Sequence, residues 1–134
     1  MLALIPARGG SKGLPKKNIM LFNGLPLIAH TIIAAIKSKK VSQIVISTDS
    51  EEIANISRQY DVRIPFMRPD TLAEDNSIAN DAYIYTIDRL NSEFNESYKE
   101  FVILQPTSPL RNSMDIDNAI NLFFEKGADS VVSC

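Results

Sequence analysis

The sequence has a single cysteine, Cys134, so the chain cannot form an internal disulfide, which suits a reducing cytoplasm. It has no apolar run long enough to cross a membrane and no secretory signal, because the apolar stretch 1–7 is too short for either. Its net charge is only −2, which argues against general binding to nucleic acid. We therefore expect a cytoplasmic protein that binds neither a membrane nor nucleic acid.

A glycine-rich, basic loop at residues 8–18 directly follows the apolar stretch. Its three glycines and four cationic side chains are Gly9, Gly10, Gly13, Arg8, Lys12, Lys16 and Lys17. The glycines allow positive φ and bring backbone N–H groups close to a ligand, and the cations favour a dense anion such as a nucleoside triphosphate. The loop lacks the Gly-Lys-Ser/Thr sequence of a Walker A loop and the G-x-G-x-x-G spacing of a dinucleotide site. It is interpreted as a phosphate-binding loop of a third kind, and the alternative is a solvated surface turn.

A length of 134 residues with 45 % hydrophobic content fits one domain with its own core. Continuous apolar runs predict strands at residues 2–6, 43–48, 101–105 and 130–133, with a weaker candidate at 62–66. Apolar residues at helical spacing predict helices marked by residues 25–36, 53–60, 79–90 and 116–123. This alternation predicts an α/β fold with a parallel sheet and right-handed crossovers.

The predicted helices also have candidate ends. The apolar face of the first helix, with Pro26 in its first turn, consists of Leu25, Ile28, Ile32, Ala35 and Ile36. Candidate N-terminal caps of the other three helices are Asp49 or Ser50, Asn76 or Ser77, and Ser113. Gly127 is expected to end the last helix. His30, beside the apolar face of the first helix, is interpreted as a packed or half-exposed residue and not as a catalytic base.

Polar segments at residues 8–18 and 105–111 follow two of the predicted strands, and the polar segment 47–49 ends a third. Ligands of parallel α/β sheets bind at the carboxyl ends of the strands, so we expect these segments to converge on one edge. Asp49 is the carboxylate that the strand pattern places there, either as a helix cap or as a ligand of a metal or a ribose. Asp75 is open to the same two interpretations.

Two longer motifs are Ile5-Pro6-Ala7-Arg8-Gly9-Gly10-Ser11-Lys12-Gly13-Leu14-Pro15-Lys16-Lys17-Asn18 and Leu104-Gln105-Pro106-Thr107-Ser108-Pro109-Leu110-Arg111. Together they resemble the CMP-sialic acid synthetases, also called acylneuraminate cytidylyltransferases, and segments 47–49 and 67–69 match in the same order. The Ser-Lys-Gly and Lys-Asn of the first motif favour this family over the related CMP-Kdo synthetases. The resemblance implies a Rossmann-like, GT-A-like nucleotidyltransferase fold, with three layers and a mainly parallel sheet. Residues 1–134 would form the nucleotide-binding part of a cytidylyltransferase domain.

The reaction implied by the resemblance is attack by the anomeric hydroxyl of a sialic-type nonulosonic acid on the α-phosphate of CTP, with release of pyrophosphate. The catalytic cations that clamp the phosphates would be Arg8, Lys12 and Lys17. Nucleotide contacts would come from Gly9, Gly10, Ser11, Gly13, Asn18, Arg68, Asn76 and Ser77. Contacts to the sugar acid would come from Gln105, Thr107, Ser108 and Arg111. The structural alternatives are caps for Asn18, Asn76 and Ser77, a stiffened turn around Gln105, and ion pairs for Arg68 and Arg111.

The resemblance also implies Mg²⁺ as cofactor and a homodimer for the complete enzyme. In the family the ion is held by aspartates of a D-x-D-type motif, which lies beyond the position that matches Cys134. Since nothing follows the predicted strand 130–133 to close the fold, we expect a chain that lacks its C-terminal part. We expect CTP binding but poor activity and marginal stability from these residues alone. The alternatives are a nucleotidyltransferase for Kdo or another sugar, and a non-catalytic nucleotide-binding fragment.

Overall fold

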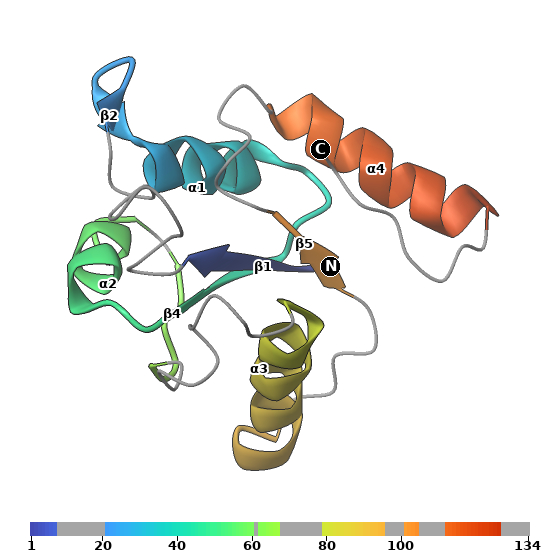
Figure 1. The fold of residues 1–134 in the computed structure, drawn as a ribbon. Coiled ribbons are helices and arrows are strands. Elements are labelled where there is room, and N and C mark those ends of the chain that lie inside the picture. The colour runs from blue at the N-terminus through green and yellow to red at the C-terminus, as the bar shows by residue number, and fades with distance from the viewer. Residues whose placement is uncertain (8–20, 61, 68–78, 96–100, 105–111, 127–134) are drawn as a thin grey trace.

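The computed structural model describes residues 1–7, 21–60, 62–67, 79–95, 101–104 and 112–126. At their centre is a parallel sheet of β1 (Leu2–Ala7), β4 (Gln43–Thr48) and β5 (Phe101–Ile103), in the order β4-β1-β5 (Figure 1). Leu2 of β1 is aligned with the first residue of each neighbouring strand. The structure confirms the predicted parallel sheet, with β1 as its central strand.

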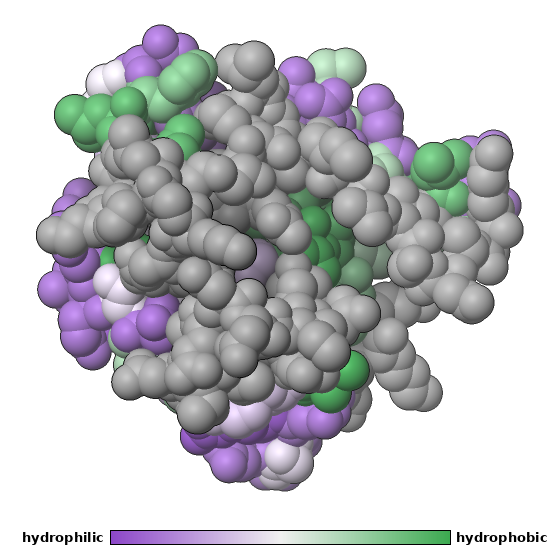
Figure 2. Space-filling model, in the orientation of Figure 1, coloured by the Kyte–Doolittle hydropathy of each residue, from purple (hydrophilic) through white to green (hydrophobic). Residues whose placement is uncertain are grey.

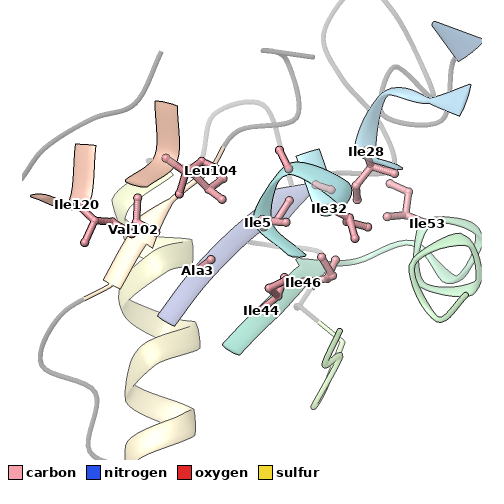
Figure 3. Close-up of a cluster of buried hydrophobic side chains, with 14 residues drawn as sticks. Ala3, Ile5, Ile28, Ile32, Ile44, Ile46, Ile53, Val102, Leu104 and Ile120 are labelled. Carbon is pink, nitrogen blue, oxygen red and sulfur yellow. The ribbon is translucent and has the colours of Figure 1, made fainter. Parts of the chain in front are cut away.

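One face of the sheet is covered by α1 (Leu27–Lys37), α2 (Glu51–Ser57) and α4 (Ser113–Lys126) (Figure 1). Ala3 and Ile5 of β1 point to this side, since side chains alternate along a strand. The helical isoleucines in the same buried cluster are Ile28, Ile32, Ile53 and Ile120, all labelled in Figure 3, together with Ile116. Apolar residues at helical spacing therefore build this layer, as predicted.

The opposite face of the sheet is covered by α3 (Ala79–Glu93) (Figure 1). Leu2 and Leu4 of β1 form a second buried cluster there, together with Ile87 and Leu90 of α3. Burial on both faces explains why β1 is a continuous apolar run and not an alternating one. The sheet is thus the middle of three layers.

A short antiparallel hairpin, which the sequence analysis did not predict, precedes α1. It consists of β2 (Leu21–Phe22) and β3 (Leu25–Pro26). Asn23 and Gly24 between them have φ angles of +50° and +84°. Type I′ turns require positive φ at both central residues, and Asn-Gly is their strongest sequence signal. That dipeptide could have predicted the hairpin.

The hairpin also corrects the predicted start of the first helix. Leu25 and Pro26 belong to β3, so α1 begins only at Leu27. Ile36, predicted on the apolar face, is wrongly assigned, because its side chain is 45 % exposed. Ala35 is buried, and one residue is a rotation of about 100° along a helix, which turns Ile36 out of the buried face.

The weak strand candidate at residues 62–66 is only a single bridge in the structure, between Arg63 and Val45. Arg63 N donates to Ile44 O at 2.9 Å, and Ile46 N donates to Arg63 O at 2.8 Å. Pro65 has no N–H group with which to extend this ladder, so the pairing stops after one residue.

The cap of α4 is Asn112, so the sequence analysis was wrong in expecting Ser113. Asp115 N donates to Asn112 Oδ1 at 2.9 Å, and Asn112 N donates to Asp115 Oδ2 at 3.2 Å. This reciprocal pair resembles a capping box, with an acidic residue three positions after the cap. The predicted strand 130–133 and the predicted ends at Gly127, Asn76 and Ser77 lie outside the described residues.

Asp117 joins α4 to the loop between α1 and β4. Its carboxylate accepts hydrogen bonds from Ser38 Oγ and from the backbone N–H groups of Lys39 and Lys40, the latter two at 3.2 and 3.1 Å. Partial loss of water acts to raise the pKa of this carboxyl, but the hydrogen bonds outweigh it and the pKa of Asp117 is lowered.

The Asp117→Asn variant should therefore lose less stability in acid than the wild type. A carboxyl whose pKa is lower in the folded state than in the unfolded state contributes to the free energy of unfolding. This contribution is complete when the pH is above the unfolded-state pKa of 3.8, and it is lost as the pH falls through the folded-state pKa. Urea unfolding at a series of pH values should show a steeper acid decline of the free energy of unfolding for the wild type. Parallel curves for the two proteins would contradict the role given to Asp117.

Candidate functional site

The carboxyl ends of the three strands lie side by side at one edge of the sheet. Ala7, the last residue of β1, is aligned with Thr48, the last residue of β4. On the other side Leu4 is aligned with Ile103, and Leu104 N donates to Leu4 O at 3.0 Å. The strand ends that precede the three polar segments thus lie together, as predicted.

The order of the strands makes the end of β1 the expected place for a ligand. The chain passes from β1 through α1 to β4 on one side, and β5 then pairs on the other side of β1 after α3 (Figure 1). In open α/β sheets ligands bind outside the carboxyl ends of the strands, where the connections diverge in this way. The glycine-rich loop begins at residue 8, immediately after this strand end.

The side chains assigned to the nucleotide and the sugar acid lie outside the described residues. They are Arg8, Gly9, Gly10, Ser11, Lys12, Gly13, Lys17, Asn18, Arg68, Asn76, Ser77, Gln105, Thr107, Ser108 and Arg111. Their roles stay predictions. The structure describes the ends of β1, β4 and β5, which precede these segments in the chain, and the contacts that hold those strand ends.

The polar residues at the end of β4 are used for structure. Ser47 Oγ and Thr86 Oγ1 are hydrogen-bonded at 3.2 Å and join β4 to α3. Thr48 Oγ1 accepts from Ser50 N at 3.1 Å, and Ser50 Oγ accepts from Ile53 N at 3.3 Å. Ser47 and Thr48 are both buried, so the Ser47 hydroxyl serves the contact with α3 and the Thr48 hydroxyl serves the turn into α2.

Ser50, and not Asp49, caps α2, which decides between the two predicted candidates. Glu51 and Glu52 in the first turn suit the positive end of the helix dipole. Asp49 is half-buried beside the cap. Of the two interpretations given to Asp49, the cap is therefore wrong, and a role toward a ligand stays a prediction.

The segment that leads to Arg68 is held against α3 by an aromatic and cationic cluster that the sequence analysis did not identify. The Arg89 guanidinium lies 4.0 Å from the ring centroid of Phe66 and donates to Tyr85 OH at 2.9 Å. It also donates to Glu93 Oε2 at 2.7 and 2.9 Å. The hydrogen bonds to Glu93 and then to Tyr85 raise the pKa of Arg89. Tyr85, Arg89 and Glu93 are spaced four residues apart, so the sequence could have predicted that their side chains are neighbours on one helix face.

His30 is half-buried, as expected, and its ring contacts the hairpin. Its Nε2 is hydrogen-bonded to Phe22 O, and the two rings meet edge to face with centroids 5.5 Å apart. His30 thus connects α1 to the strand that follows the glycine-rich loop.

No three His, Cys, Asp or Glu side chains come together to hold a metal ion within the part of the chain that the structure describes. The Mg²⁺ that the resemblance implies therefore stays a prediction, and we assign no ligand to it among the described residues. The same described ranges contain no helix that is both long and apolar enough to span a membrane.

Residues 2–134 match the family model for cytidylyltransferases. The chain belongs to the cytidylyltransferase family. It is 43 % identical to the CMP-N,N'-diacetyllegionaminic acid synthase of Legionella pneumophila, over 99 % of this chain and 56 % of that protein. It is 39 % identical to the pseudaminic acid cytidylyltransferase of Campylobacter jejuni, over 92 % of this chain and 53 % of that protein. The chain thus spans about half the length of these curated relatives.

Solved structures confirm the predicted nucleotidyltransferase fold of this cytidylyltransferase family member. CMP:2-keto-3-deoxy-manno-octonic acid synthetase complexed with CTP superimposes with a TM-score of 0.76 at 20 % identity, over 95 % of this chain and 48 % of that one. A cytidylyltransferase from Leptospira borgpetersenii gives a TM-score of 0.67 at 24 % identity, over 92 % and 48 % of the two chains. At these identities the likeness establishes the fold alone.

Proposed function

We propose that this chain binds CTP and forms the nucleotide-binding part of an enzyme that transfers CMP to a sialic-type nonulosonic acid. The observation that carries the proposal is the alignment of Ala7 with Thr48 and the pairing of Leu104 with Leu4. It brings the described ends of β4 and β5 to the two sides of β1, the strand that the glycine-rich loop follows, in a cytidylyltransferase family member.

The loop residues would neutralise the triphosphate. Arg8, Lys12 and Lys17 provide three cations, and the loop glycines provide backbone N–H groups, so that an incoming hydroxyl is not repelled from the α-phosphate. The anomeric oxygen forms a bond to that phosphorus as the bond to the bridging oxygen of the pyrophosphate breaks, and the hydroxyl proton is released. Positioning and charge stabilisation are the main contributions of a protein to such a transfer.

The segment 105–111 would hold the sugar acid next to the phosphates. Gln105 offers both a donor and an acceptor to sugar hydroxyls, and Arg111 can pair with the sugar carboxylate. Thr107 and Ser108 add hydroxyl groups between them. Mg²⁺ would supply further charge neutralisation when bound, and we assign it no ligand among the described residues.

Support for a nonulosonic acid comes from the relatives. Proteins named for N,N'-diacetyllegionaminic, pseudaminic and N-acylneuraminic acid are 38–43 % identical to this chain. The chosen sugar, a homodimer of the complete enzyme and a cytoplasmic location stay predictions.

Product analysis tests the proposed transfer. The purified chain, at amounts equal to its substrates, is incubated with CTP, MgCl₂ and one of four sugars, namely the three nonulosonic acids above or Kdo. Mass spectrometry should detect only slow formation of a CMP-nonulosonic acid, because the chain spans about half the length of its relatives. A CMP-Kdo product would favour the alternative nucleotidyltransferase. Fast turnover at catalytic enzyme levels would contradict the expectation of poor activity.

A further inference from the structure

Asn23 and Gly24, at the tip of the hairpin, combine a side-chain amide with an unhindered backbone nitrogen. Asn23 is the only asparagine in the sequence that directly precedes a glycine. Both residues are exposed. The hairpin projects from the rest of the fold at the upper left of Figure 1, and Figure 2 shows the same part of the molecule at the surface. Water and hydroxide ions therefore reach this dipeptide.

The space around Gly24 leaves the Asn23 amide open to attack. A side chain at position 24 would crowd the backbone nitrogen, and Gly24 has none. Apart from its two chain neighbours, no heavy atom lies within 4 Å of the position that a Cβ of Gly24 would take. Glycine also adopts backbone angles that other residues rarely reach. The backbone nitrogen of Gly24 can therefore approach the side-chain carbonyl carbon, Cγ, of Asn23.

The pairing of the hairpin restrains this approach only weakly. In the closed turn Asn23 and Gly24 are held at φ angles of +50° and +84°. The strands β2 and β3 have only two residues each, and a two-stranded hairpin is marginally stable in water. Exposed turns with few buried contacts open at free energies far below that of global unfolding. The turn therefore opens while the sheet and the helices stay folded.

Asn112 provides a contrast within the same chain. It is also exposed and precedes a small residue, Ser113. Its amide is held in the cap of α4, because Asp115 N donates to Asn112 Oδ1 at 2.9 Å and Asn112 N donates to Asp115 Oδ2 at 3.2 Å. An attack on this amide would require the loss of the capping pair. Asn112 is therefore a protected asparagine with which Asn23 can be compared.

We propose that Asn23 is a site of spontaneous deamidation, which proceeds through a cyclic imide formed with Gly24. The backbone nitrogen of Gly24 loses its proton and forms a bond to Cγ of Asn23, as the bond from Cγ to the side-chain nitrogen breaks and ammonia leaves. Water then opens the imide at one of its two carbonyl groups. The products are an aspartate or an isoaspartate, whose backbone runs through the former side chain. The net reaction consumes one water, releases one ammonia and does not depend on binding of CTP.

The two products should change the hairpin differently. Both add a negative charge at position 23, but only the isoaspartate adds a methylene group to the backbone between Phe22 and Leu25. These two residues are paired across the turn. A type I′ turn joins its strands through two residues of fixed backbone angles, so a longer connection disrupts the pairing. Isoaspartate formation should therefore speed amide hydrogen exchange in residues 21–26.

Ageing of the purified wild-type chain tests the proposal. One sample is kept folded in mildly alkaline buffer, which favours loss of the Gly24 proton, and a second is kept in urea. Mass spectrometry of the digested protein follows the conversion of amide to carboxyl at Asn23 and Asn112, and peptide fragmentation distinguishes isoaspartate from aspartate. Asn23→Gln is the matched variant, because its longer side chain keeps the amide but closes a ring much less readily.

In the folded chain we expect Asn23 to convert about tenfold faster than Asn112, because the hairpin opens more readily than the helix cap. Isoaspartate should be among the products, and Asn23→Gln should abolish the conversion of the hairpin peptide. Equal rates at Asn23 and Asn112 in the folded chain, with rapid conversion of Asn23 only in urea, would show that the closed turn protects the site and would overturn the proposal. Conversion of the hairpin peptide in Asn23→Gln at the wild-type rate would also overturn it. The comparison within the wild-type chain does not depend on the folding of the variant.

Discussion

Replacing Lys17 with alanine is expected to weaken the binding of CTP by about tenfold to a hundredfold and to leave the fold intact. A hydrogen bond to a charged group contributes about 1.5–3 kcal/mol, and each 1.4 kcal/mol corresponds to a factor of ten in affinity. Lys17 belongs to the loop that follows the carboxyl end of β1, where ligands of such sheets bind. Calorimetry of the purified variant measures the loss, and circular dichroism checks the fold.

Lys16→Ala is the matched control for this experiment. It removes the same charge from the neighbouring position, to which the sequence analysis assigns no contact with the phosphates. Its effect on CTP affinity should therefore be small and should shrink as salt is added, because exposed charges are screened. Equal losses for the two variants would indicate nonspecific attraction of an anion to the loop. An unchanged affinity for Lys17→Ala would contradict the assigned role.

Replacing Ile5 with alanine is expected to lower the free energy of unfolding by about 2–5 kcal/mol. Ile5 lies in the central strand, is 0 % exposed and packs in the cluster with α1, α2 and α4 (Figure 3). The truncated side chain loses its transfer free energy and leaves a cavity between the sheet and the helices. Urea denaturation followed by circular dichroism measures the change, and a drop of this size would unfold much of a marginally stable chain.

Ile84→Ala provides the comparison, because it removes the same atoms from a residue that is 57 % exposed on α3. Its effect on the free energy of unfolding should stay within about 0.5 kcal/mol. Similar destabilisation by the two variants would mean that β1 is not the centre of the core.

The sheet and the helices could be predicted from the sequence because burial dictates their apolar patterns. β1 and the centre of β4, Ile44 to Ile46, are apolar runs covered on both faces, and the structure places the two strands as parallel neighbours. The Asn23-Gly24 hairpin was not predicted, although its turn signal is present in the sequence. The strand predicted at residues 62–66 is only one bridge at Arg63, because Pro65 has no N–H group with which to extend the pairing.

The side-chain contacts between elements next to the candidate site could not be predicted from the sequence in the way that the sheet and the helices could. The contact of His30 with Phe22 depends on how a hairpin folds back onto a helix, which no periodic pattern encodes. The stacking of Arg89 on Phe66 joins residues from separate elements. The family resemblance, in contrast, was carried by two contiguous motifs, and the match over residues 2–134 confirms it.

The central claim is that this chain contains a binding site for CTP. Calorimetric titration of the wild-type chain with CTP, UTP, ATP and GTP, in MgCl₂ at one salt concentration, tests it most directly. We predict saturable binding of CTP with one site per chain and clearly weaker binding of the other three nucleotides. Absence of saturable CTP binding, or equal affinity for all four nucleotides, would contradict the claim.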